Sequence, residues 1–182
     1  MFANMTLRKL KLYIAGSLDG YIAKPDDDLG FLDRVQKSGE DYGYNEFMAT
    51  VDTVIMGRRT YEWVMSRVDE FPHSDKETYI VTHDVRPGIG NIHFYSGNLK
   101  DLILELKIRK GKNIFCDGGA TIINELLKHK LIDEIILSVI PVLLGNGIRL
   151  FLDGRSEQYL ELISSRQFDT GLIQLHYRIL AE

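Results

Sequence analysis

The stretch of sequence that decides the fold is Ile114-Phe115-Cys116-Asp117-Gly118-Gly119-Ala120-Thr121. Its apolar start predicts a buried strand, the glycine pair ends that strand, and residues with better helix propensity follow. The same order occurs upstream in Val54-Ile55-Met56-Gly57-Arg58-Arg59-Thr60. Strands that alternate with helices through short turns are typical of a parallel sheet covered by helices. The two turns should therefore lie at one edge of one sheet, at the carboxyl ends of their strands.

The flanking segments continue this alternation. Apolar and polar residues alternate over residues 9–15, which predicts a first strand, and a short amphipathic helix is expected over 42–50. The same reasoning predicts strands over 53–56, 78–82, 91–95, 114–116 and 134–139, and helices over 59–65, 99–110 and 120–128. Residues 1–6 carry no pattern.

The last third of the chain changes character. A turn-rich region over 141–148 is followed by two strands, 159–168 and 172–180, which Asp169-Thr170-Gly171 joins as a hairpin. These segments predict an α/β protein with a mainly parallel mixed sheet, helices on both faces and an antiparallel C-terminal hairpin. The length of 182 residues and the absence of a linker or repeat predict a single domain over 1–182.

Composition excludes several classes of protein. Apolar residues make up 45% and charged residues 26%, and the net charge is −4 without a basic block, which argues against nucleic-acid and anionic-membrane binders. No apolar stretch approaches the roughly 20 residues of a membrane helix, and no secretory signal is evident. We therefore expect a cytoplasmic protein with no membrane or nucleic-acid partner. The single cysteine, Cys116, excludes an internal disulfide and is expected in a buried strand.

The two glycine turns also predict an anion site. Glycines let the backbone approach a ligand, and the helix that follows each turn offers free amides and a positive dipole end. Arg58 and Arg59 stand at a helix start, where the dipole disfavours cations and a bound phosphate would compensate them. The alternative is that the glycines close tight turns and the arginines are solvated. Neither stretch is a Walker phosphate loop or a three-glycine dinucleotide fingerprint.

Four ordered motifs resemble one known family. They are residues 15–23 (AGSLDGYIA), 54–62 (VIMGRRTYE), 117–120 (DGGA) and 141–147 (PVLLGNG). Their order is similar to that of the dihydrofolate reductase-like superfamily, and the nearest branch resembles the reductase domain of riboflavin biosynthesis and its stand-alone relatives. The resemblance covers about residues 8–180.

The resemblance implies a three-layer αβα fold that binds NADPH and forms a homodimer. It also implies a cis peptide within the glycine pair, with the nicotinamide near Ala15, Ile22 and that pair and the phosphates near Gly57 and the residues after it. The full set of cofactor-binding residues implied is Ala15, Ile22, Gly57, Arg58, Arg59, Thr60, Thr82, His83, Asp117, Gly118, Gly119, Ala120 and Thr121. His83 has the alternative of an exposed loop histidine.

The proton source for hydride chemistry is a separate question. Asp41 precedes the short helix near the position where dihydrofolate reductases carry an acidic substrate-binding residue, so it is the candidate catalytic acid. The alternative is that Asp41 caps the helix. Tyr44, Phe47 and Trp63 are candidates for substrate contacts, although aromatics at helical spacing usually belong to the core.

Other patterns indicate less. The loop over 24–30 contains Asp26-Asp27-Asp28, which lacks the spacing of a calcium loop and is expected to be solvated. The five histidines form no metal motif, and one cysteine cannot supply the zinc site of the deaminase that often accompanies the riboflavin reductase. We thus expect an NADPH-dependent reductase of a small heterocyclic or sugar-derived substrate, such as 5-amino-6-(5-phosphoribosylamino)uracil. Dihydrofolate reduction and non-catalytic nucleotide binding are the alternatives.

Overall fold

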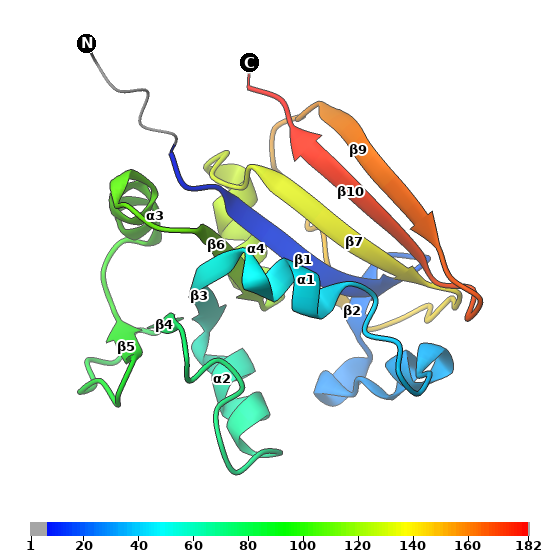
Figure 1. The fold of residues 1–182 in the computed structure, drawn as a ribbon, viewed down its shortest axis with the longest axis horizontal. Coiled ribbons are helices and arrows are strands. Elements are labelled where there is room, and N and C mark those ends of the chain that lie inside the picture. The colour runs from blue at the N-terminus through cyan, green and yellow to red at the C-terminus, as the bar shows by residue number, and fades with distance from the viewer. Residues whose placement is uncertain (1–6, 182) are drawn as a thin grey trace.

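The computed structural model of the protein describes residues 7–181, so residues 1–6 lie outside it. An eight-stranded sheet runs through the molecule in the order β5-β4-β3-β6-β1-β7-β10-β9 (Figure 1). Its strands are β1 (Leu10–Ser17), β3 (Val51–Gly57), β4 (Glu77–Val81), β5 (Ile92–Tyr95), β6 (Asn113–Gly118), β7 (Glu134–Ile140), β9 (Leu160–Gln167) and β10 (Ile173–Ile179).

The sheet is parallel except at one edge. β1 pairs in parallel with β6 and β7, and β3 pairs in parallel with β4 and β6. β10 pairs antiparallel with both β7 and β9, which forms the C-terminal hairpin. The predicted α/β class with a mainly parallel mixed sheet is therefore confirmed, as is the final hairpin.

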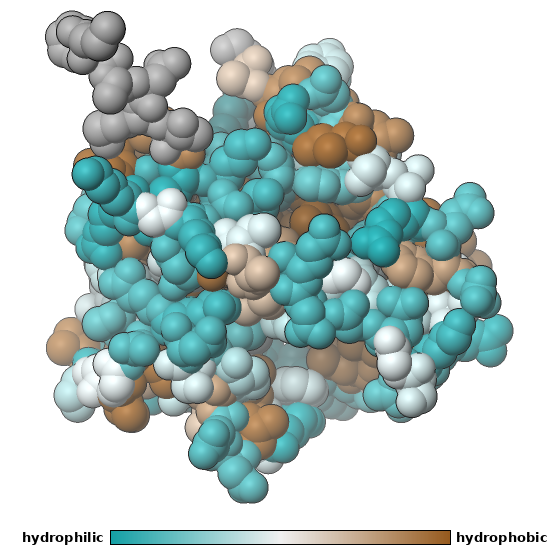
Figure 2. Space-filling view, in the orientation of Figure 1, coloured by the Kyte–Doolittle hydropathy of each residue, from teal (hydrophilic) through white to brown (hydrophobic). Residues whose placement is uncertain are grey.

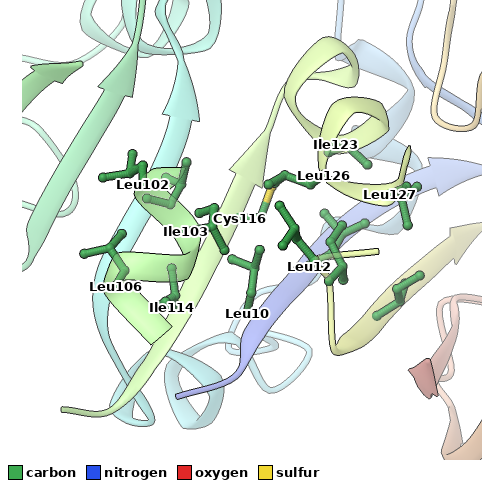
Figure 3. Packing of buried hydrophobic residues seen from close by; sticks show 14 of the residues in the cluster. Leu10, Leu12, Leu102, Ile103, Leu106, Ile114, Cys116, Ile123, Leu126 and Leu127 are labelled. Carbon is green, nitrogen blue, oxygen red and sulfur yellow. The ribbon is translucent and has the colours of Figure 1, made fainter. Parts of the chain in front are cut away.

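Helices cover both faces of the sheet. On one face lie α3 (Leu99–Ile108) and α4 (Ala120–Lys128), and Figure 3 shows leucine and isoleucine side chains from both helices directed at Cys116, Leu10 and Leu12. On the other face, α1 (Tyr44–Ala49) and α2 (Arg58–Met65) pack against a second cluster that includes Phe115, Val54 and Met56. Neighbouring residues of one strand thus serve opposite clusters, as the period of two requires, and three layers result.

Cys116 lies at the centre of the first cluster with none of its surface exposed. Burial raises the pKa of its thiol to about 12, so the reactive thiolate is scarce at neutral pH. The predicted role as a buried strand residue is confirmed.

Two helix boundaries differ from the sequence prediction for backbone reasons. The first helix begins at Tyr44 because Tyr42 and Gly43 have left-handed φ values of 57° and 82°, which a right-handed helix cannot contain. The third helix ends at Ile108 because Arg109 is already extended, with φ −69° and ψ 152°.

Four short elements were not predicted. β2 (Tyr21–Ala23) and β8 (Ile148–Arg149) form a two-stranded sheet, and η1 (Pro25–Asp27) and η2 (Gly30–Val35) are 3-10 helices. Segments of two to six residues are too short to show a periodic pattern. They nevertheless matter, because they form one wall of the cleft described below.

Candidate functional site

A cleft of about 790 Å³ crosses the carboxyl ends of β4, β3, β6 and β1. Cofactor-binding residues predicted from the sequence gather in its wall: Ala15, Ile22, Gly57, Arg58, Arg59, Thr60, Thr82, His83, Asp117, Gly119, Ala120 and Thr121. Gly118 alone of the predicted set does not line it and is buried behind the wall. The structure therefore brings together residues that are far apart in the sequence.

The two glycine turns touch each other. β3 and β6 are neighbours in the sheet, which places Gly57 beside Gly118 and Gly119. A Cβ at Gly119 would stand 3.1 Å from Thr60 Oγ1, and a Cβ at Gly57 would stand 3.2 Å from Ile122 Cγ1. Side chains at these positions would crowd the floor of the cleft, so glycine keeps backbone amides open to a ligand.

The Gly118–Gly119 peptide is cis, as the resemblance implies, and Gly118 has a φ of 112°. That φ lies in a region that residues with a side chain rarely adopt. Both features turn the chain sharply from β6 into the start of α4.

The end of the cleft at β3 and β4 is basic. Arg58 and Arg59 begin α2, and His83 follows β4. Arg58 Nη1 lies 3.2 Å from Glu62 Oε1, one helical turn away. His83 is exposed, whereas Thr82 is buried and its Oγ1 accepts a hydrogen bond from the Asp84 amide at 3.1 Å.

Arg59 has a partner that the sequence analysis missed. Its Nη2 and Nε lie 2.7 and 2.8 Å from Oδ2 of Asp27 in the 24–30 segment. Trp63 Nε1 donates to the Asp27 carbonyl oxygen at 3.1 Å. The expectation that the aspartate run is solvated is therefore wrong for Asp27, because the folded chain brings η1 against α2. Asp27 itself lines the cleft.

The end of the cleft at β1 is mostly apolar. Tyr13 and Ala15 of β1 line it together with Leu29 and Leu32, which come from the segment around η2. The alternation of residues 9–15 predicted a strand, but no local pattern indicated that Tyr13 would meet a segment beyond residue 24. Ala15 was predicted, but Tyr13, Leu29 and Leu32 were missed because only the chain reversal at 18–20 brings them together.

Asp117 is the carboxylate next to the glycine pair. It lines the cleft at the end of β6, and Nε2 of the buried His73 lies 3.7 Å from its Oδ2. The His73 ring is held edge-on against Phe71 and Phe115, with centroids 5.4 and 6.0 Å apart. A distance of 3.7 Å exceeds a hydrogen bond, but catalytic contacts often tighten only when ligand is bound.

Tyr13 lines the β1 end of the cleft, and the Tyr44 ring packs against it with centroids 5.6 Å apart. Burial raises the pKa of the Tyr44 hydroxyl, and the charge of Asp117 raises it further. Burial also raises the pKa of Tyr13, which a hydrogen bond from Gln174 partly offsets. Both phenols are therefore neutral at physiological pH.

Asp41, the predicted catalytic acid, does not line the cleft. Its Oδ1 accepts from the Gly43 amide at 2.9 Å and its Oδ2 from the Asn45 amide at 3.0 Å. These two bonds lower the pKa of Asp41, the bond from Asn45 most. The alternative role as a cap is thus the one its contacts match, and the catalytic role stays a prediction.

The three candidate substrate aromatics separate in the structure. Phe47 is buried in the second core cluster, and Tyr44 packs against that cluster. Trp63 lines the cleft. The general rule that aromatics at helical spacing belong to the core applies to two of the three.

Within residues 7–181, no three His, Cys, Asp or Glu side chains are grouped closely enough to hold a metal ion. Among the helices of that range, none has the length and apolar character needed to span a membrane.

Known proteins are similar to this chain in sequence and in fold. The sequence model of the RibD C-terminal domain matches residues 8–174. The Bacillus subtilis (strain 168) protein YwjB is 43% identical over 171 residues, which cover 93% of this chain and 97% of YwjB.

Two solved structures extend the comparison. A Shewanella sp. PV-4 protein named for riboflavin biosynthesis has a TM-score of 0.85 at 31% identity, covering 95% of this chain and 99% of that one. A dihydrofolate reductase from Enterococcus faecalis, complexed with NADP(H), has a TM-score of 0.64 at 14% identity over 95% and 97% of the two chains. The second likeness shows the dihydrofolate reductase-like fold, and the family match with the closer relatives shows that the chain belongs to the RibD C-terminal domain family.

Proposed function

We propose that the protein is an NADPH-dependent reductase of a small heterocyclic or sugar-derived substrate. The observation that carries this proposal is the single cleft in which both glycine turns, two arginines and Asp117 meet. The family is one of RibD-type reductases, and the cleft is of a size that small-molecule and cofactor sites commonly have.

The residues present fit a dinucleotide. Gly57 and Gly119 leave backbone amides open where a side chain would crowd Ile122 or Thr60, and amides at helix starts bind pyrophosphate. Arg58 and Arg59 would hold the 2′-phosphate, with Thr82 and His83 on the adenosine side. Ala15, Ile22 and the glycine pair would bound the nicotinamide. When bound, the cofactor supplies the hydride.

The protein's own task is to orient the substrate, exclude water and supply a proton. Tyr13, Leu29 and Leu32 form an apolar wall that would exclude water at the β1 end. Asp117 lies on β6 between the two ends, and its carboxylate would take up a proton from solvent and pass it to the acceptor, while His73 behind it would position that carboxylate. We therefore propose Asp117 in the role that the sequence suggested for Asp41.

Candidate reactions are reduction of 5-amino-6-(5-phosphoribosylamino)uracil, which the family and the Shewanella relative support, and reduction of dihydrofolate, which the shared fold supports. A protein that binds nucleotide without catalysis is the third possibility. Turnover measured by NADPH absorbance with each substrate separates these three.

NADPH binding tests the proposal directly. Titration of the protein, followed by NADPH fluorescence, should show saturable binding at micromolar concentrations. Substitution of Arg58 and Arg59 together by Ala should weaken NADPH at least about tenfold and NADH much less, because only NADPH carries the 2′-phosphate. Arg155→Ala, on the exposed loop after β8, is the matched control. Absence of binding of either nucleotide would reject the proposal.

We also propose that two copies associate through the final hairpin. Every residue of β9 is exposed, and large apolar side chains accumulate there, such as Leu160 at 45% and Leu162 at 53% exposure. Figure 2 shows hydrophobic residues near the C-terminus, where β9 begins and β10 ends. An exposed apolar edge strand invites pairing with another chain.

A further inference from the structure

The charged groups of the cleft are separated along its length. Arg58, Arg59 and His83 all lie at the β3 and β4 end. Among the residues that line the β1 end, no lysine or arginine occurs; Tyr13, Leu29 and Leu32 are found there instead. Asp117, on β6 between the two ends, adds a carboxylate. The cleft is thus cationic where the cofactor phosphates are proposed to bind. Where the substrate would bind, its walls are apolar and its charged group is the Asp117 carboxylate.

Two lysines near the β1 end are turned to other partners. Lys24 Nζ lies 3.1 Å from Asp28 Oδ2, and Lys37 Nζ lies 3.2 Å from Asp169 Oδ2. None of these residues lines the cleft.

Arg34 of η2 and Arg149 of β8 also lie on that side without lining the cleft. Arg166 of β9 is a further basic group there. Its guanidinium stacks over the Phe168 ring at 5.2 Å, and its Nη1 stands 2.9 Å from the place where a Cβ of Gly43 would be. It does not line the cleft either. A phosphate group at the β1 end would therefore lose its hydration without gaining a cation, and it would face the Asp117 carboxylate, which costs binding free energy.

Asp117 favours a different chemistry. An ionised carboxylate only accepts hydrogen bonds, and on its far side the carboxylate faces the ring of His73, which is buried between Phe71 and Phe115. Its cleft side is left to a ligand that offers N–H or O–H groups. The neighbouring apolar walls suit a flat ring.

Resting on the reductase function proposed above, we propose that the substrate is an uncharged, planar nitrogen heterocycle that donates N–H groups to Asp117 and carries no phosphate. This assigns the substrate class and makes Asp117 the residue that selects it. A phosphorylated ribosyl-uracil is then a poor substrate, and an unphosphorylated heterocycle is a good one.

Binding to the NADPH complex tests this inference with two probes. The full-length protein is first saturated with NADPH, which fills the arginine end, and is then titrated by calorimetry with 5,6-diaminouracil or with ribose 5-phosphate. We expect saturable binding of 5,6-diaminouracil and no saturable binding of ribose 5-phosphate over the same concentration range. Asp117→Asn should weaken 5,6-diaminouracil about tenfold or more, because a charged acceptor is lost. Asp169→Asn, at the exposed hairpin turn, is the control and should bind as the wild type does.

Each other outcome decides against the inference. Saturable ribose 5-phosphate binding to the NADPH complex would overturn it while leaving the reductase function intact, as would a failure of 5,6-diaminouracil to bind. Unchanged 5,6-diaminouracil affinity in both Asp117→Asn and Asp117→Ala, each with a wild-type thermal midpoint, would remove Asp117 from substrate selection. Failure of NADPH itself to bind would reject the proposed function and this inference together.

Discussion

Asp117 and Asp41 show how strongly the role of a carboxylate depends on its surroundings. Asp117 lines the cleft beside the glycine pair, whereas both oxygens of Asp41 accept hydrogen bonds from amides at the start of α1. We predict that Asp117→Asn lowers kcat about 100-fold or more, the usual contribution of a positioned acid or base. Asp41→Asn should leave kcat unchanged and lower the thermal midpoint. Steady-state NADPH oxidation with an accepted substrate measures both variants. Loss of turnover in Asp41→Asn, with Asp117→Asn still active, would return the catalytic role to Asp41.

Glu134 is a buried charge whose contacts predict a pH-dependent stability. Lys9 Nζ, Lys11 Nζ and His176 Nε2 lie 2.6, 2.8 and 3.0 Å from its oxygens. Burial alone would raise its pKa, but the hydrogen bonds from Lys11 and Lys9 outweigh burial and lower the pKa from 4.5 to about 2. Because the folded value lies below the unfolded one, this stabilisation is complete above about pH 4.5 and declines as the pH falls toward 2.

Glu134→Gln should therefore destabilise the protein by about 3 kcal/mol at pH 7, because it leaves lysines without their buried partner. At pH 3 the difference from wild type should be smaller. Urea unfolding at the two pH values measures it, with Glu161→Gln, an exposed partner of Arg178, as the control. A difference that does not shrink at low pH would contradict this account of Glu134.

At the scale of elements, η1 is attached to α2 across the mouth of the cleft. Asp26 and Asp27 both have left-handed backbones, with φ values of 62° and 59°, which costs free energy in residues with side chains. The Arg59 and Trp63 contacts to Asp27 hold this conformation. Asp27 places a carboxylate on the guanidinium that we propose binds phosphate, so the two anions would compete for Arg59.

Asp27→Asn should consequently raise the affinity for NADPH about two- to fivefold and change NADH less, since an exposed ion pair contributes at most about 1 kcal/mol. Asp26→Asn, on the neighbouring exposed residue, should have no such preference. Fluorescence titration of wild type and both variants with each nucleotide gives the dissociation constants that are needed. An NADPH affinity that falls in Asp27→Asn would show that Asp27 supports phosphate binding rather than opposing it.

At the scale of the whole molecule, the sheet ends in β9, every residue of which is exposed among residues 7–181. Leu162 is 53% exposed and Tyr159 is 64% exposed. We predict a dimer in solution by analytical ultracentrifugation, and Leu162→Asp should shift it to a monomer because it places a charge in the apolar contact. Leu104→Asp, at a leucine of α3 that is 47% exposed, should remain a dimer. A wild-type monomer at high concentration would reject the proposed interface.

The sequence was sufficient for the elements of the main sheet and its helices, and for the fold class, but not for β2, β8, η1 and η2. Residue patterns predicted the strands of the main sheet and the helices that cover it. Local backbone geometry repeats side-chain direction every two residues in a strand and every 3.6 residues in a helix, so the pattern of apolar residues is visible in the sequence. The glycine turns were predictable for the same reason: a strand that stops at glycine before a helix must turn there. Ordered motifs then placed the chain in its superfamily, which the family match and the shared fold confirm.

Only the tertiary structure decided what surrounds the ligand. The contact between Arg59 and Asp27 joins residues 32 positions apart, and His73 reaches Asp117 from a loop between α2 and β4. Neither contact has a local signature, because it depends on which loops the strand order brings to one edge of the sheet. The same geometry left Asp41 outside the cleft and made its β1 end apolar. The sequence by itself therefore determined the turns that can hold a dinucleotide, and the folded chain determined which side chains would face the substrate.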